Sequence, residues 1–187
     1  MLMPPSLPAW NAIHPLVVHF PIALSFVAPI FVGAAVFLPR RAGTASACCG
    51  LLLLVMAAAS MFVATATGEA AEELAERAVG GAAAALERHE DFAVTARALF
   101  LVLAVMLAMI EGAFALLGRR RPVRMWIRRA ARATVVLLCL PALLVLMNAA
   151  HAGGQLVHGY GIRAAIGGDP ATLPAPAPTR VDHDDDD

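Results

Sequence analysis

Four long apolar runs, separated by short polar stretches, dominate the pattern of hydrophobic and polar positions along the chain. The runs cover about residues 16–38, 47–66, 98–117 and 133–150. Each is close to the ~20 residues that a helix needs to cross the hydrocarbon core of a bilayer. The pattern predicts an all-α fold, a four-helix transmembrane bundle whose outer surface contacts the lipid bilayer.

Composition supports this prediction and excludes several other classes of protein. Apolar residues make up 60% of the 187 residues and charged residues 15%, whereas soluble domains average about 45–50% and about 25%. A soluble enzyme, a nucleic-acid-binding protein and a secreted disulfide scaffold are therefore disfavoured. Beyond residue 166 the chain becomes rich in proline and aspartate. We predict a membrane domain over residues 1–166 and a disordered tail over residues 167–187.

The charges sum to zero, with 14 basic and 14 acidic residues, but they are unevenly distributed. The stretch between the first two runs holds Arg40 and Arg41, and the stretch over residues 119–132 holds seven arginines; neither contains an acid. Residues 69–91 carry seven acids against two arginines, and we predict one or two short outer helices there. The positive-inside rule places the arginines in the cytoplasm. We therefore predict a multi-pass protein of the bacterial inner membrane with both termini on the outer, periplasmic side.

Five histidines lie at the predicted outer ends of the spans. Counting about 1.5 Å per residue from the arginine stretches gives two layers. His19 and His151 form a lower layer near the membrane edge. At the same rise per residue, His14, His89 and His158 form an upper layer that lies about 8–12 Å further outward. Three helices thus bring imidazoles to one region of the protein.

Clustered imidazoles indicate metal or proton chemistry, since neutral imidazole ligates haem iron, copper or zinc. Helix bundles commonly hold such cofactors in their cores. We predict one or two haem b groups with histidine ligands, His19 pairing with His151 and His89 with His158, while His14 is a further candidate.

Several alternatives remain open from the residues alone. The histidines can be interfacial side chains, or His14, His89 and His158 can hold copper or zinc, or the protein can be a structural subunit of a membrane complex. Three arginines are candidate partners of haem propionates: Arg97, Arg88 and Arg163. Glu111, inside the third run, serves either a proton path or an ion pair with an arginine.

Sequence motifs add a family resemblance. Residues 13–24 read IHPLVVHFPIAL, which resembles the HPxxVHFPIAL signature of a bacterial membrane-protein family called domain of unknown function 2231. The likeness continues through Ala66-Thr67-Gly68, His89-Glu90 and the run HAGGQLVHGYG over residues 151–161, and it covers about residues 11–163. The family's last motif more often reads LVYxHG, so the likeness supports His158 least.

The resemblance implies a four-helix membrane protein in a redox setting, because some members are joined to Rieske iron–sulfur or c-type cytochrome modules. Together with the histidines, it leads us to expect a b-type haem electron-transfer protein. Its expected partner is a cytochrome or iron–sulfur protein at the outer face, and the chain is expected to work as a subunit of a larger membrane complex.

Overall fold

The computed structural model describes residue 10 and residues 13–78, 82–119 and 123–161, with the backbone alone for residues 70–78. The elements are α1 (His14–Val17), α2 (His19–Phe37), α3 (Arg40–Ala78), α4 (Ala83–Leu117) and α5 (Met125–His158). Every one of these described elements is a helix. Four segments are long and apolar enough to span a membrane: His14–Phe37, Arg40–Glu69, Ala83–Leu117 and Met125–His158. The predicted all-α bundle with four membrane-spanning helices is confirmed.

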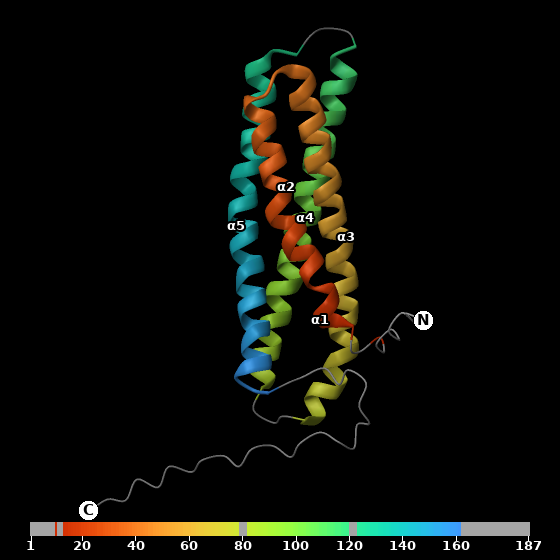
Figure 1. Cartoon of the computed structure of the whole chain (residues 1–187), viewed down its shortest axis with the longest axis vertical. Helices are drawn as coiled ribbons and strands as arrows, with labels where there is room; N and C mark the ends of the chain where they lie inside the picture. Colours follow the sequence, from red (N-terminus) through yellow and green to blue (C-terminus); the bar gives the residue numbers. More distant parts are fainter. Residues whose placement is uncertain (1–9, 11–12, 79–81, 120–122, 162–187) are drawn as a thin grey trace, which may run out of the picture.

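The four long helices lie side by side in one elongated bundle, and α3 extends beyond the others at the lower end of Figure 1. α2 packs against α3 and α5, and α4 packs against the same two helices, so α2 lies diagonally opposite α4. The connections after α2 and after α4 lie at one end, at the top of Figure 1. We call this end, which carries Arg40, Arg41 and Arg124, the arginine end. The opposite end, where α1 and α4 begin and α5 finishes, carries His14 and His89 and is called the histidine end.

A break at Val18 separates α1 from α2, although the two helices follow each other closely. Pro15 lies in the first turn of α1. A backbone N–H there has no carbonyl within the helix to donate to, so proline costs the helix no hydrogen bond. Pro21 has no N–H to donate to the carbonyl of Val17, four residues earlier, and its ring crowds that carbonyl. The break leaves α1 as a separate turn, packed against α3.

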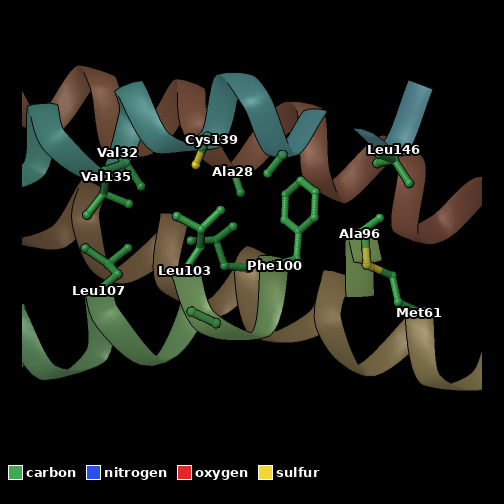
Figure 2. Packing of buried hydrophobic residues seen from close by; sticks show 13 residues of the cluster. Ala28, Val32, Met61, Ala96, Phe100, Leu103, Leu107, Val135, Cys139 and Leu146 are labelled. Carbon is green, nitrogen blue, oxygen red and sulfur yellow. The ribbon is translucent and has the colours of Figure 1, made fainter. Parts of the chain in front are cut away.

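The middle of the bundle is a tightly packed apolar core, to which all four long helices contribute (Figure 2). Phe100 and Leu107 of α4 are fully buried, as are Val32 of α2 and Cys139 of α5. Close approach of α2 and α3 depends on Gly50, where an added Cβ would lie 2.6 Å from a methyl carbon of Val32. Small residues at helix contacts are typical of membrane bundles, which gain stability from close packing.

The outward faces of the bundle are apolar as well. Large exposed hydrophobic side chains occur on every long helix, among them Ile30, Leu52, Met109 and Leu137. Soluble monomers rarely expose apolar patches larger than a few hundred Å², so this surface indicates contact with lipid.

Two helices are longer than the apolar runs that predicted them. α3 continues to Ala78 and α4 begins at Ala83, so the polar residues after position 68 extend the transmembrane helices. The outer helices expected over residues 69–91 are thus present as extensions of the spans: the second leads directly into the third span, and the first is a continuation of α3. The predicted break at residues 80–81 and the predicted tail at 167–187 lie outside the described residues.

The arginine end also differs from the expected long loop, because α5 already begins at Met125. Arg128 and Arg132 lie inside this helix and are buried, at 4% and 1% exposure. Arg132 donates from Nε and Nη2 to the two carboxylate oxygens of Glu111, at 2.8 and 2.9 Å, and from Nη1 to the carbonyl of Ala35 at 3.1 Å. Of the two roles open to Glu111, the structure confirms the ion pair with an arginine.

Candidate functional site

His14, in the first turn of α1, is fixed by hydrogen bonds to α3. Its Nδ1 lies 2.9 Å from the carbonyl oxygen of Ala64 and 3.1 Å from Oγ1 of Thr67. A carbonyl oxygen can only accept, so Nδ1 carries the proton and donates it. The Thr67 hydroxyl donates to backbone carbonyls of its own helix and is likewise an acceptor for His14. The neutral ring therefore has its lone pair on Nε2.

His89, in the second turn of α4, is held in the same way by α5. Its Nδ1 lies 2.8 Å from the carbonyl oxygen of Ala149. The same reasoning assigns the proton to Nδ1 and the lone pair to Nε2. Both histidines are half-buried, so each ring is shielded from solvent but not enclosed.

A glycine lies beside each ring, four residues after the accepting carbonyl. A Cβ added to Gly68 would lie 3.3 Å from Cε1 of His14, and one added to Gly153 would lie 3.0 Å from Cε1 of His89. Residues four apart share a helix face, so each glycine continues the surface that offers the carbonyl. The absence of a side chain allows the imidazole to lie flat against the helix backbone.

The two halves of the bundle thus repeat one arrangement. In each, a histidine at the start of a helix donates to the alanine of an Ala-x-x-x-Gly sequence on the next helix of the same hairpin. α2, which continues α1, lies diagonally opposite α4, so the histidines come from opposite corners of the bundle. His14 and His89 lie at the same end of the bundle, one on each hairpin. The site therefore consists of two oriented imidazoles, one from each hairpin.

This arrangement offers two nitrogen ligands whose tautomers are already set. Metal-ligating histidines usually donate their other ring N–H to a carbonyl or carboxylate, which fixes the ring and raises its basicity. Among the described residues there is no group of three or more His, Cys, Asp or Glu side chains placed to hold a metal ion. The two histidines can supply two ligands and no third protein ligand.

The other predicted ligands lie elsewhere on the surface of the bundle. His19, His151 and His158 are all exposed. The Nε2 of His151 lies 3.2 Å from the side-chain nitrogen of Gln155 on the same helix. The structure brings neither His19 and His151 nor His89 and His158 together by any contact among the described residues.

The predicted two layers are incorrect in height. His151 falls between Ala149 and Gly153, the two residues that contact His89, so it lies level with His89 and on the outer face of the same turn. The count started from an arginine stretch ending at Arg132. That residue is buried in α5, so it does not mark the start of the membrane.

Arg97 lies two turns along α4 from His89, towards the middle of the bundle. Its Nη1 donates to Oγ1 of Thr65 at 2.8 Å, and its guanidinium lies 4.9 Å from the ring centroid of Phe62. It forms no ion pair with any acid in the described part of the chain. The positive charge of Arg97 is thereby held beside Thr65, which directly follows Ala64, the residue whose carbonyl accepts from His14.

The backbone carbonyls that orient the histidines could not be identified from the sequence, although Thr67, Gly68 and Gly153 lie in motifs that the sequence shows. These carbonyls belong to Ala64 on α3 and Ala149 on α5. The available signal was weak, because the Ala-x-x-x-Gly spacing at 64–68 and 149–153 also occurs at 108–112 and 150–154.

Comparison with known proteins supplies the family. A family described as "Predicted membrane protein (DUF2231)" matches residues 11–165, which include every described residue of the site. No curated protein and no solved structure matches the chain.

Proposed function

The chain belongs to this DUF2231 family of predicted membrane proteins, and from that premise we propose that it is a b-type haem electron-transfer protein whose haem would be held by His14 and His89. The observation that carries the proposal is the matched pair of Nδ1 hydrogen bonds, 2.9 Å to Ala64 and 2.8 Å to Ala149. They leave two Nε2 lone pairs, one from each side of the bundle.

The donor set fits haem better than a bare metal ion. The porphyrin already supplies four ligands to its iron, so the protein needs to add two at most. A zinc site uses at least three protein ligands, and the described residues offer no such group. The proposal therefore takes one haem at this pair, and the exposed His19, His151 and His158 are not among its ligands.

The position of Arg97 is a second observation that supports the proposal. An arginine within a membrane helix is costly and typically pairs with an anion or lines a functional site. Arg97 is held by Thr65 and Phe62, which leave its charge without a neutralising acid. A haem propionate is a carboxylate that Arg97 would neutralise through a charge-assisted hydrogen bond.

The proposed orientation follows from the arginine end, which the positive-inside rule assigns to the cytoplasm. The histidine end then faces the periplasm of a bacterial inner membrane. A bound haem would supply one-electron redox chemistry there. The chain's own residues fix the ligand tautomers, exclude bulk water with the surrounding helices and hold a positive charge at Arg97. A cytochrome or iron–sulfur protein at the outer face is the proposed redox partner.

The test is the visible spectrum of the protein purified from cells supplied with a haem precursor. We expect a Soret band, a sharp α-band on reduction, and about one haem per chain by the pyridine-haemochrome assay. His14→Ala and His89→Ala are each expected to lose the low-spin spectrum, because each removes one strong-field ligand. His19→Ala and His151→Ala are the matched controls, since both side chains are exposed at the same end of the bundle.

Two outcomes would overturn the proposal. A colourless protein that carries stoichiometric copper or zinc would replace haem with a non-haem metal. An unchanged low-spin spectrum in both His14→Ala and His89→Ala would show that the ligands lie elsewhere. A loss in the two control variants alone would restore the pairing of His19 with His151.

A further inference from the structure

A shallow surface cavity, largely open to solvent, lies along one face of α3 at the arginine end, far from the histidines. Its volume is about 450 Å³ and it is lined by Arg40, Arg41, Thr44, Ala45 and Cys48. Ligand pockets typically measure about 300–1,000 Å³. All five residues belong to the first turns of α3, which begins at Arg40. The cavity therefore lies where this helix enters the apolar part of the bundle.

Positive charge collects around this cavity without acids to balance it. The described residues contain one ion pair, and it uses Glu111 and Arg132, so Arg40 and Arg41 have no acidic partner. Arg40 is near enough to Arg128 for their charges to interact unfavourably. Arg128 is 4% exposed, and its Nε has no hydrogen-bond partner. A bound anion beside Arg40 would relieve this repulsion.

The wall of the cavity changes from polar to apolar along α3. Arg41, Ala45, Cys48, Leu52 and Val55 follow one another at helical spacing and so share one face. All are exposed, Leu52 at 60% and Val55 at 49%. The charged end of this face meets the edge of the membrane, and its apolar end lies within it.

We propose that the cavity binds the phosphate group of an anionic phospholipid, with an acyl chain lying along the exposed apolar face of α3. The guanidinium groups of Arg40 and Arg41 bind the phosphate oxygens, which suits the geometry of their N–H donors. The Thr44 hydroxyl is not a donor here, because it donates to the carbonyl of Arg40. Basic pockets at the cytoplasmic ends of membrane helices are typical headgroup sites.

The first experiment measures lipid binding to the purified full-length protein by native mass spectrometry. Dioleoyl-phosphatidylglycerol is compared with dioleoyl-phosphatidylcholine, which has the same acyl chains and no net charge. We expect the anionic lipid to bind at least about tenfold more tightly, because phosphatidylcholine carries beside the same phosphate a choline cation that the two arginines repel. The double variant Arg40→Gln, Arg41→Gln should lose this preference.

The matched control is Arg124→Gln, Arg129→Gln, which removes the same charge from two exposed arginines outside the cavity. It should keep the preference. An equal loss in this control would overturn the proposal, because general surface charge would then explain the binding. Displacement of the lipid by inorganic phosphate at equal concentration would also overturn it, because the site would then recognise free phosphate.

A second measurement needs no change to the arginines. Cys48 lines the cavity and is exposed, so its reaction with a maleimide reports on occupancy. In a Cys49→Ser variant, phosphatidylglycerol should slow this reaction several-fold and phosphatidylcholine should not. Equal rates with the two lipids would overturn the proposal even if the arginine variants fail to fold.

Discussion

Replacing Glu111 by glutamine should strongly destabilise the bundle, although the two side chains have almost the same shape. The Glu111 carboxylate accepts two hydrogen bonds from Arg132, at 2.8 and 2.9 Å. The side chains are 8% and 1% exposed. In the variant an amide NH₂ faces one of the guanidinium donors, and the charge of Arg132 remains buried.

The magnitude follows from the charge that is left behind. Removing one partner of a buried ion pair typically costs about 3–5 kcal/mol, because the other charge stays in a low-dielectric environment. Arg132 keeps its hydrogen bond to the carbonyl of Ala35 and one to the amide oxygen of the glutamine, and neither group neutralises its charge. For a chain of this size, each kcal/mol lowers the melting temperature by about 2–4 °C. The expected decrease is therefore about 6–20 °C.

The assay is thermal unfolding of the detergent-solubilised protein, followed by the monomer peak in size-exclusion chromatography. Glu87→Gln is the matched control, since Glu87 lies on the same helix and is exposed; it should change the melting temperature by no more than about 1 °C, as surface substitutions do. The double variant Glu111→Leu, Arg132→Met should recover most of the loss, because it buries no charge. An equal effect of the two single variants, or a double variant worse than Glu111→Gln, would refute this reasoning.

Two further predictions concern the histidine end and the orientation. Gly153→Ala should lower the haem content, because its Cβ would lie 3.0 Å from Cε1 of His89 and displace the ring from its hydrogen bond to α5. The control Gly154→Ala, with open space around the added Cβ, should leave the pyridine-haemochrome ratio unchanged. Equal effects of the two variants would contradict the role of Gly153. In intact spheroplasts of Cys48→Ser, Cys49→Ser protein, a membrane-impermeant maleimide should label Glu87→Cys and not Arg124→Cys, while the reverse pattern would invert the topology.

The all-α fold and the number of membrane-spanning helices could be predicted from the sequence because the requirement for crossing a lipid bilayer is simple. Each span must present about 20 apolar residues, and that requirement is visible without any tertiary information. The lengths of the helices could not be read in the same way. α3 continues to Ala78 because residues 69–78 are mostly strong helix formers that extend a helix already begun, so polarity does not mark its end.

The two histidines of the candidate site, His14 and His89, were both among the predicted ligands, but the prediction paired His89 with His158 and gave His14 no partner. Counting residues places a side chain along a helix axis and says little about its direction around that axis. The buried position of Arg132, which depends on Glu111 from another helix, shifted the count on α5. The bonds from the histidines to Ala64 and Ala149 are contacts with backbone atoms, which leave almost no trace in residue identity.

The distance along α4 between His89 and Glu111 has an energetic consequence. Twenty-two residues separate His89 from Glu111, which corresponds to about 33 Å along the helix, close to the ~30 Å thickness of the hydrocarbon layer. The histidine pair therefore lies at one edge of the electric field across the membrane. A charge that reaches this pair from its own side crosses almost none of the transmembrane voltage, whereas one arriving from the arginine end would cross nearly all of it, at about 2.3 kcal/mol per 100 mV. The equilibrium of the proposed electron transfer between the histidine pair and a partner on its own side would thus be insulated from the state of energisation of the cell.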